Sequence, residues 1–505
     1  MDLTLYPLGE YCDLLDKLGA PAAPPPAGPE LDRTVELVSY NSREVVPGTL
    51  FLCKGAHFKP EYLAQAAQKG AFAYVSEVPY PQVELPCILV RDMRRVLAPL
   101  AVKYYNDPSQ KLKVAGVTGT KGKTTTAWYL KAILDKYLAS KGTSCALISS
   151  LETWDGVECA PSHMSTPEPL ELQRHLARAA ANRLEYAVME ASSQGLKYHR
   201  TLGTKFAAAA FLNIGTDHIS PIEHPDFDDY FQSKLKIFAQ AELSCVNLDC
   251  DHAQEALEAA RAACGSVLTF SRRDPAAGVY GHDVRKVGHE ILFQAEAAQL
   301  TGQYRLTMPG LFNVDNALAA IALCRGLDIP QEAVREGLAG ASVPGRMEVY
   351  SSQNGQVAAI VDYAHNRMSL ETLLRCVKEE YPDRRVTAVF GCPGGKALDR
   401  RRDMGEVAGQ YADRVYLTED DPGEEDPVAI CGEIAAHVTC PWEIWPNRSE
   451  AIRQAILGCG RPTVVVIAGK GAERHQKRGL EWVETPSDKQ YAQAFLREYD
   501  ARRGR

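Results

Sequence analysis

The sequence has no excess of basic residues, no membrane-length apolar run and no signal peptide. Its 505 residues include 56 Lys and Arg against 64 Asp and Glu, which gives a formal net charge of -8. Because a nucleic-acid backbone requires a strongly basic surface, this charge argues against a nucleic-acid partner. No apolar run approaches the roughly 18 residues of a membrane helix, and "MDLTLYPLGEYCDLL" lacks the charged and apolar parts of a signal peptide. We therefore expect a soluble, cytoplasmic protein without membrane insertion.

Cysteine is present, but not in a pattern that indicates zinc binding or disulfides. The 14 cysteines include no CxxC pair and no zinc-ligand spacing. Reduced, buried thiols are the simplest interpretation, and they are typical of a reducing compartment such as the cytoplasm.

Composition and length indicate a globular protein with several domains. Hydrophobic residues make up 45% of the chain and charged residues 24%, which is close to ordinary globular usage. A chain of this length is too long for a single hydrophobic core. We expect three domains of the α/β class, at residues 1–110, 111–340 and 341–505.

Alternating strand-like and helical runs support this division. In the first domain, "LFLCKG" and "FAYVSEV" predict strands on either side of the helical "YLAQAAQKG". The second has strand "KVAGVTG", a helix from Thr124 that closes at Gly142, and strand "SCALISS", an order that predicts a P-loop-type, mostly parallel central sheet. In the third, "QVAAIVDYAH", "RVTAVFGCPGG", "DRVYLTEDD" and "TVVVIAGKG" predict a Rossmann-like, doubly wound sheet.

The most informative stretch is "VAGVTGTKGKTTTAWYL", from Val114 to Leu130. A glycine-rich turn between a strand and a helix lets backbone N–H groups and the helix N-terminus hold phosphate oxygens. Lys123 is placed to neutralise the outer phosphates, and the Thr124 hydroxyl to ligate Mg²⁺. The strict P-loop pattern fails, because Val117 stands where its first glycine belongs. The stretch predicts nucleotide binding by Gly119, Thr120, Lys121, Gly122, Lys123, Thr124 and Thr125, and leaves the reaction open.

Several motifs, with the loop spacing "GTKGKT", resemble those of the Mur ligases, ATP-dependent enzymes that add amino acids to the peptidoglycan precursor. They are "NSREVVPGTLFLCKG", "STPEPLELQ", "MEASSQGLKYHR", "NIGTDH" followed by "YFQSKLKIF", "GRMEVY", "VDYAH", "VFGCPGG" and "IAGKGAE". Their order is most similar to the tripeptide synthetases of the family, the MurE type. The resemblance runs from about Val35 to about Glu473 and so covers nearly the whole chain.

The resemblance implies an ADP-forming, ATP-dependent acid–amino-acid ligase. The γ-phosphate of ATP would pass to the D-glutamyl carboxylate of a UDP-N-acetylmuramoyl dipeptide, and the amine of an amino acid would attack the acyl phosphate. Because this reaction brings two anions together, it requires metal ions and basic groups. The implied partners are small molecules, namely ATP, the UDP-muramoyl dipeptide and an amino acid, bound by a monomer.

In the central domain, the resemblance assigns catalysis to Lys123, Glu190, His218 and Lys234. Two Mg²⁺ sites are assigned to Thr124, Glu190, His218 and Lys234. Glu190 ends the strand "YAVME", at the edge where ligands bind in open α/β sheets. Lys234 matches a lysine that many members carry as a carbamate, which would turn a cation into an oxygen ligand for the second Mg²⁺.

The resemblance also assigns contacts to the nucleotide and to the acceptor. The nucleotide set is Asn316, Arg346, Asp362, Tyr363 and His365. The set for the uridine and the muramoyl peptide is Ser42, Ala56, His57, Phe58, Ser165, Thr166, Ser192, Tyr198 and Arg200. Two departures leave the acceptor open: Tyr198 replaces a family glutamine, and Arg367 and Met368 stand where proline and a small residue are usual.

The amino-acid pocket departs from the pattern of one branch of the family. Members that add meso-diaminopimelate carry Asp-Asn-Pro-Arg, whose arginine holds the distal carboxylate. Here "EDDPGEEDP" has Gly423 in place of that arginine, so we expect no cation to pair a distal carboxylate. A basic amino acid, L-lysine or ornithine, is therefore expected. The residues assigned to the amino acid are Arg401, Asp420, Asp421, Gly469 and Glu473.

Two other functions fit part of these observations. A folylpolyglutamate-type or other Mur-like ligase with a different acceptor would share the loop and the carbamate lysine, but the first-domain motif and "GKGAE" favour the muramoyl branch. A nucleotide-binding scaffold without turnover would fit Tyr198 and the "NRM" departure. The presence of Lys123, Glu190 and Lys234 argues for an active enzyme, which would release phosphate only with both acceptor and amino acid.

We predict that Lys234 is carbamylated and that Lys234→Ala loses nearly all ligase activity. A short-chain carboxylic acid added to this variant should restore part of the activity, because only an oxygen anion is needed in that space. Activity is measured as acceptor-dependent phosphate release. An active alanine variant, together with an unmodified Lys234 amine in a well-ordered structure, would contradict the prediction.

Overall fold

The structure, a computed structural model, describes residues 3–26, 28–55, 58–162, 164–216, 219–220, 223–287, 290–396 and 398–503. The chain forms two compact units. The first comprises Met1–Val284, Leu292–Arg305 and Asp315–Gly340, and the second comprises Arg285–Ile291, Leu306–Val314 and Ala341–Arg505. The boundary expected at residue 110 stays a prediction, because it falls inside the first unit.

A parallel sheet of four strands forms the amino-terminal part of the first unit. Its order is β1-β2-β3-β4, and each neighbouring pair is parallel. The strands are β1 (Leu37–Ser39), β2 (Thr49–Leu52), β3 (Ala71–Ser76) and β4 (Cys87–Leu89), and the helices are α1 (Leu8–Lys17), α2 (Pro60–Gln68) and α3 (Met93–Tyr104). Every residue of β2 and β3 is buried, as expected for a parallel sheet covered by helices.

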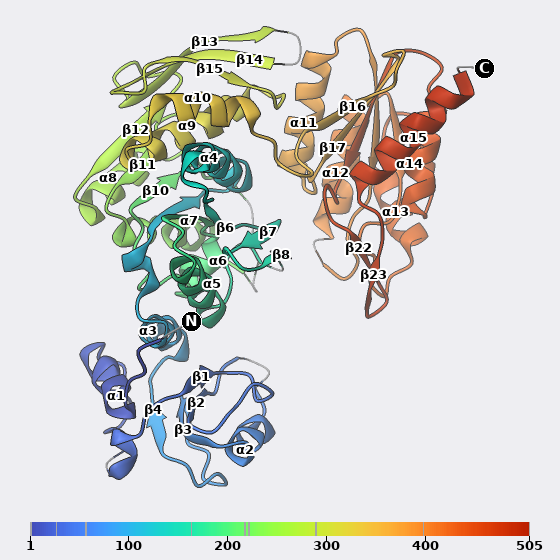
Figure 1. Ribbon diagram of the computed structural model, residues 1–505. Coiled ribbons are helices and arrows are strands. Elements are labelled where there is room, and N and C mark those ends of the chain that lie inside the picture. Colours follow the sequence, from blue (N-terminus) through green and yellow to red (C-terminus); the bar gives the residue numbers. More distant parts are fainter. Residues whose placement is uncertain are drawn as a thin grey trace. The chain divides into compact units, whose positions relative to one another are not determined.

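An eleven-stranded sheet, in the described residues, forms the rest of the first unit, in the order β15-β14-β13-β12-β11-β10-β5-β9-β6-β7-β8 (Figure 1). Its central strands are β5 (Lys113–Thr118), β6 (Ala146–Ile148), β9 (Tyr186–Glu190), β10 (Ala208–Phe211) and β11 (Ser244–Asn247), paired in parallel. An edge hairpin consists of β7 (Glu152–Trp154) and β8 (Cys159–Pro161). The helices are α4 (Lys123–Leu138), α5 (Pro169–Ala181), α6 (Ser193–Lys197), α7 (Phe227–Leu235), α8 (Ala253–Ala263), α9 (Phe312–Gly326) and α10 (Gln331–Gly340).

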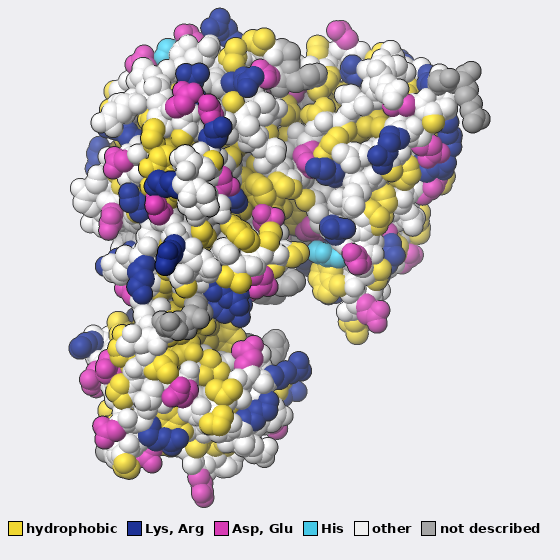
Figure 2. Space-filling view, in the orientation of Figure 1, with side chains coloured by type: hydrophobic (Ala, Val, Ile, Leu, Met, Phe, Trp, Pro, Cys, Tyr) yellow, Lys and Arg dark blue, Asp and Glu magenta, His cyan; other side chains and the backbone are white. Residues whose placement is uncertain are grey.

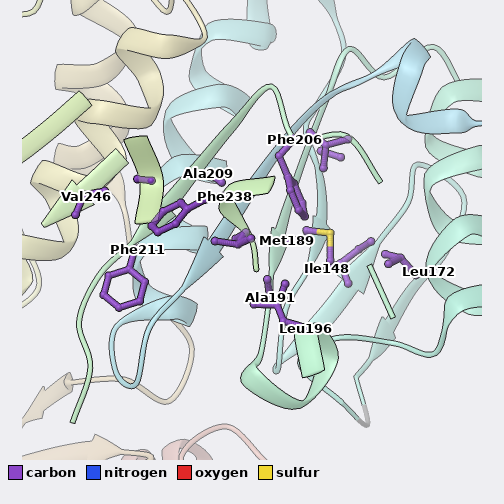
Figure 3. Close-up of a cluster of buried hydrophobic side chains, with 14 of the residues drawn as sticks. Ile148, Leu172, Met189, Ala191, Leu196, Phe206, Ala209, Phe211, Phe238 and Val246 are labelled. Carbon is purple, nitrogen blue, oxygen red and sulfur yellow. The ribbon is translucent and has the colours of Figure 1, made fainter. Parts of the chain in front are cut away.

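One core cluster packs against the strands that carry the glycine-rich loop. Figure 3 shows Phe206, Phe211 and Phe238 with Met189 and Ile148, and all five side chains are almost fully buried. Gly116, inside β5, lies so close to this cluster that an added Cβ would be 2.9 Å from the Phe206 ring. The strand before the loop therefore requires a glycine at this point for packing.

The sequence analysis missed β7, β8 and β11 of this sheet, and also the four strands that follow β11 in the chain. These four are β12 (Val267–Ser271), β13 (Val279–Val287), β14 (Glu290–Ala297) and β15 (Gly302–Leu306). In β14, buried and half-exposed residues alternate along most of its length, which is typical of a strand with one covered face. The predicted helix after the loop is confirmed: α4 continues as a 3-10 turn, Ala139–Lys141, that closes at Gly142.

The second unit contains a doubly wound sheet in the order β16-β17-β21-β18-β19-β20, as predicted. Its strands are β16 (Glu348–Ser351), β17 (Val357–Asp362), β18 (Arg385–Phe390), β19 (Arg414–Leu417), β20 (Trp442–Ile444) and β21 (Thr463–Ala468). Among the described strands of this sheet, only β16 pairs antiparallel. The helices are α11 (Arg367–Glu380), α12 (Asp399–Tyr411), α13 (Pro427–Ala435), α14 (Arg448–Leu457) and α15 (Asp488–Arg503). The "NRM" departure begins α11, where Asn366 and Ser369 form a capping box.

The surface agrees with the charge expected from composition. On the face shown in Figure 2, basic and acidic side chains are interspersed, and no continuous basic stripe is visible. Within the described ranges, no helix combines the length and the apolar character needed to cross a membrane.

Candidate active site

The predicted phosphate loop, residues 119–122, connects β5 to α4 and contains a glycine that cannot be replaced without strain. Gly122 has a φ of +86°, and an added Cβ would lie 2.2 Å from Asn316 Oδ1. Asn316, predicted to contact the nucleotide, therefore lies directly against the loop. Its Oδ1 also accepts a hydrogen bond from the Thr126 hydroxyl at 3.5 Å.

Asn213, which follows β10, holds the loop from the side. Its Oδ1 accepts the Lys121 N–H at 2.9 Å, and its Nδ2 donates to the Lys121 carbonyl at 3.1 Å. The Thr120 N–H donates to the Asn213 carbonyl at 3.0 Å. The sequence analysis quoted this residue in "NIGTDH" but gave it no role. The structure shows that it fixes the backbone of two loop residues.

Two lysines predicted to be catalytic meet at one carbonyl of the loop. Lys123 Nζ donates to the Gly119 carbonyl at 2.9 Å and to the Thr120 carbonyl at 3.2 Å. Lys234 Nζ, on α7, donates to the same Gly119 carbonyl at 2.9 Å and lies 4.5 Å from the Tyr230 ring centroid. Its side chain is only 1% exposed. The carbamylation of Lys234 stays a prediction.

A short chain of hydrogen bonds links the start of α4 to Glu190. The Thr124 and Ser150 hydroxyls are 3.0 Å apart, and the Ser150 N–H donates to Glu190 Oε1 at 2.7 Å. The second oxygen, Glu190 Oε2, is buried without a hydrogen-bond partner in the described chain. A buried carboxylate oxygen is costly unless it is paired, so this oxygen and the Thr124 hydroxyl fit the donor set of a hard cation.

Three residues predicted to bind the acceptor lie together beside Glu190. Thr166 Oγ1 donates to the Glu190 carbonyl at 3.0 Å and accepts the Ser192 N–H at 2.9 Å. Arg200 donates to the Thr166 carbonyl at 3.1 Å and pairs with Glu168 at 3.0 Å. Ser165, the adjacent residue, is half-buried.

Tyr198 lies apart from this group. The Arg94 guanidinium stacks over its ring at 4.1 Å from the centroid. Arg94 lies in the first turn of α3, two residues after the N-cap Asp92, and Tyr198 is the C-cap of α6. The contact therefore joins α6 to the amino-terminal part of the first unit. The tyrosine that replaces the family glutamine thus packs against another part of the first unit.

Of the residues predicted to bind the uridine, Ser42 and Phe58 are described, and each makes a different kind of contact. Ser42 Oγ donates to Gln65 Oε1 at 3.1 Å. Phe58 packs in an aromatic cluster, 5.6 Å from the Tyr80 ring and 6.2 Å from the Tyr62 ring. The predicted residues Ala56, His57 and His218 lie outside the described residues.

In the second unit, Tyr363 connects two predicted subsites. The Arg346 guanidinium lies over its ring at 4.5 Å, and its hydroxyl donates to Glu473 Oε1 at 3.0 Å. Asp362 accepts the N–H groups of Met347 and Ala364 at 2.9 and 2.8 Å, and burial raises its pKa. The His365 ring is 4.8 Å from the Tyr363 ring. The nucleotide and amino-acid sets of this unit therefore share a hydrogen bond.

Two cations from outside the acidic stretch after β19 pair with its carboxylates. Lys470 Nζ is 2.8 Å from Asp421 Oδ1 and 2.5 Å from Glu473 Oε2. Arg478 donates to both oxygens of Glu419, at 3.0 and 2.7 Å. These cations come from β22 (His475–Arg478) and from the turn after β21. Reading the acidic stretch by itself could not reveal them.

Asp420 lies between these two paired residues in the chain and is itself a buried carboxylate. It is 8% exposed, and an added Cβ at Gly469 would lie 2.3 Å from its Oδ2. Burial raises the pKa of Asp420 to about 7, against the opposing charges of Arg448 and Lys470. A cationic ligand beside this carboxylate would offset the cost of its burial.

Arg401 is already engaged by acidic side chains. Its guanidinium pairs with Glu425 and with Glu433, each at 2.8 Å, and its side chain is buried. Binding of an α-carboxylate by Arg401 would require these pairs to rearrange. Its predicted role stays a prediction.

A buried histidine that the sequence analysis missed links three segments near the loop. His224 Nδ1 is 2.6 Å from Asp229 Oδ2 on α7, and its Nε2 is 3.0 Å from the Ser193 hydroxyl on α6. Asp229 also pairs with Lys197 at 2.7 Å. A histidine between a carboxylate and a hydroxyl was not predictable, because its partners lie 31 and 5 residues away. In the described part of the chain, no three His, Cys, Asp or Glu side chains gather as a metal site.

Comparisons with known proteins agree with this arrangement of loop and strands. The family model for the Mur ligase middle domain matches residues 117–324, and the one for the Mur ligase, glutamate ligase domain matches residues 345–471. A protein of Enterococcus faecalis, named UDP-N-acetylmuramoyl-L-alanyl-D-glutamate–L-lysine ligase, is 38% identical over 97% of this chain and 95% of its own length. This chain belongs to the Mur ligase family.

Two further relatives of this Mur ligase support the assignment. A UDP-N-acetylmuramyl-tripeptide synthetase of Lactobacillus acidophilus is 37% identical over 92% of this chain and 93% of its own length. The solved structure of a UDP-N-acetylmuramoyl-L-alanyl-D-glutamate–2,6-diaminopimelate ligase is 24% identical, with a TM-score of 0.68 over 99% of this chain and all of that one. The three-domain α/β fold expected for a Mur ligase is thereby confirmed, and the chain is a ligase of that family.

We predict that His224→Gln changes the pH dependence of stability. Burial lowers the pKa of His224 below its ordinary 6.5, so the stabilising neutral imidazole is complete above pH 6.5 and is lost as the pH falls. The glutamine variant should be less stable near pH 7.5 by roughly 1–3 kcal/mol. Below about pH 6.5, wild-type should lose stability more steeply than the variant as the pH falls, by at most about 1.4 kcal/mol per pH unit.

The measurement is denaturant unfolding at several pH values. His252→Gln, which changes an exposed histidine of the same unit, is the matched control and should follow wild-type. Parallel pH profiles for wild-type and His224→Gln would show that burial does not hold His224 neutral.

Proposed function

We propose that this Mur ligase uses ATP to join L-lysine to UDP-N-acetylmuramoyl-L-alanyl-D-glutamate, through an acyl phosphate on the D-glutamyl carboxylate. The observation that carries the proposal is the loop of residues 119–122, with Lys123 and Lys234 meeting at one of its carbonyls. The names of the relatives from E. faecalis and L. acidophilus support the acceptor and the amino acid. The enzyme would act as a cytoplasmic monomer on small molecules.

In this mechanism, the loop would hold the phosphates of ATP through its backbone N–H groups and the N-terminus of α4. Lys123 would exchange its loop carbonyls for phosphate oxygens and neutralise the charge that develops during transfer. Asn213 would keep the Lys121 peptide in place, because it holds both polar groups of that peptide. The residues thus position an anion and offset its charge.

Glu190 and the Thr124 hydroxyl would hold Mg²⁺, which would supply positive charge between the phosphate and the carboxylate. The unpartnered Glu190 Oε2 supports this role. Lys234 as a carbamate and His218 would be further ligands. Thr166, Ser192 and Arg200 would orient the acceptor next to Glu190, since all three are tied to the end of β9.

For the amino acid, Asp420 would pair with the side-chain ammonium of lysine. Its carboxylate is buried and has a raised pKa, whereas its neighbours Asp421 and Glu419 are already paired with Lys470 and Arg478. Glu473, held by Tyr363 and Lys470, would contact the α-amino group. A distal carboxylate beside Asp420 would instead place like charges together in a buried site.

We predict that Lys123→Ala and Thr124→Ala each lower phosphate release by at least about a thousandfold, because one removes charge from the phosphates and the other a metal ligand. The assay contains ATP, acceptor and lysine. Lys136→Ala is the control, since Lys136 is an exposed lysine on the same helix, where it pairs with Glu336 at 2.7 Å. Near-wild-type release by either test variant would refute the loop assignment.

We predict a pH-dependent preference for a basic amino acid. The pKa of Asp420 is raised to about 7, so its carboxylate ionises between pH 6 and 8 and pairs with an ammonium only when ionised. The KM for lysine of wild-type should fall by roughly tenfold over this range relative to Asp420→Asn, which stays neutral. Competition among lysine, ornithine, diaminopimelate and alanine tests the preference. A preference for diaminopimelate or alanine would contradict it.

A further inference from the structure

A small hairpin lies against the acidic stretch after β19 and follows the last residue matched by the family models. It consists of β22 (His475–Arg478) and β23 (Glu481–Glu484), which pair antiparallel and are drawn in red in Figure 1. The family match ends at residue 471. The hairpin is therefore a feature that neither the motifs nor the family models describe.

The backbone of the hairpin is bonded to the backbone of the acidic stretch. The Gly423 N–H donates to the Lys477 carbonyl at 3.0 Å, and the Gly479 N–H donates to the Gly423 carbonyl at 2.6 Å. Gly423 is the residue that replaces the arginine of the diaminopimelate-adding members. In this chain the position is held by the hairpin.

The hairpin also supports a strained residue next to Asp420. Asp421 has a φ of +48°, in the left-handed region that non-glycine residues rarely adopt. Its N–H donates to Gln476 Oε1 at 2.7 Å, and its carboxylate accepts the Lys477 N–H at 2.9 Å. Gln476 is only 2% exposed. Two neighbouring residues of β22 therefore hold Asp421 in a conformation that the chain would otherwise avoid.

On the other side of Asp420, Arg478 holds Glu419. The guanidinium donates to both carboxylate oxygens, and Glu419 is 6% exposed. Such a two-point pair fixes orientation as well as charge. The Glu419 carbonyl, in turn, accepts a hydrogen bond from Arg448 at 3.3 Å. Both neighbours of Asp420 are thus immobilised, one by Gln476 and one by Arg478.

We infer that Gln476 and Arg478 are positioning residues that hold the Asp420 carboxylate in the amino-acid pocket and so set the affinity for the amino acid. The inference rests on the proposed function and extends it to the hairpin. Neither residue contacts the amino acid in this account, and each acts through a neighbour of Asp420. Loss of either should weaken amino-acid binding and leave nucleotide binding unchanged.

The test compares Arg478→Gln, Arg478→Lys and Gln476→Leu with wild-type in steady-state kinetics. The matched control is Lys477→Ala, which removes a cation from the same strand but keeps both backbone hydrogen bonds. We expect the KM for lysine to rise at least about tenfold in Arg478→Gln and Gln476→Leu, with the KM for ATP within about twofold. Arg478→Lys should be intermediate, and Lys477→Ala should match wild-type.

A second comparison distinguishes an effect on the amino-acid pocket from poor folding of a variant. Arg478→Gln leaves Glu419 buried without its cation, whereas the double variant Arg478→Gln with Glu419→Gln removes that charge as well. If Arg478 acts through Glu419, the KM for lysine of the double variant should be no higher than that of Arg478→Gln. Thermal unfolding of each variant reports folding separately.

The outcomes separate the inference from the proposed function. An unchanged KM for lysine in the Arg478 and Gln476 variants, or an equal rise in the KM for ATP, would overturn the inference while the function stands. Wild-type protein that releases no phosphate with lysine would overturn the proposed function. If another amino acid supports turnover, its KM in the same variants decides the inference.

Discussion

The arrangement of the active site depends on the close contact between the glycine-rich loop and Asn316. Gly122 turns the chain into α4 with a left-handed φ, and any side chain there would collide with the Asn316 carboxamide. This contact aligns the N-terminus of α4, which places Lys123 and Thr124. From Thr124 the hydrogen bonds lead through Ser150 to Glu190. This one turn of the backbone thus positions the residues proposed to bind the phosphates, the metal ion and the acceptor.

The charged side chains are arranged differently in the two units. Around the loop, the Lys123 ammonium lies at the Gly119 carbonyl, in a setting suited to an anionic substrate. In the acidic stretch of the second unit, Glu419 and Asp421 are neutralised by Arg478 and Lys470, and Asp420 keeps a raised pKa. The Asp420 carboxylate, between these two paired neighbours, can therefore pair with a cationic ligand.

Much of this could be predicted from the sequence, because periodicity marks buried strands and the loop has a characteristic spacing. Four of the six described strands of the doubly wound sheet, and the helix from the loop to Gly142, were predicted correctly. Strands β12 to β15 were missed, since runs such as β14 bury alternate residues and carry polar ones between them. The partners of Asp421 and His224 could not be predicted, because hairpin and helix contacts join residues far apart in the chain.

The same limit applies to the amino-acid pocket. Gly423 in place of the arginine indicates that the motif itself supplies no cation for a distal carboxylate, and Lys470 and Arg478, which pair with the acidic stretch, come from outside the motif. Local sequence shows which charges a loop carries, and only the fold shows which of them are paired. Lysine as the added amino acid is therefore supported by the burial of the Asp420 carboxylate, and not by the number of acidic residues in the stretch.

The most direct test of the central claim is the fate of oxygen in the D-glutamyl carboxylate. With ¹⁸O in that carboxylate, ATP and lysine, phosphoryl transfer to the carboxylate predicts that one ¹⁸O atom appears in each phosphate released, because the amine displaces phosphate from the acyl carbon. Mass spectrometry of the phosphate measures the label. Phosphate without ¹⁸O, released in step with amide formation, would contradict the account.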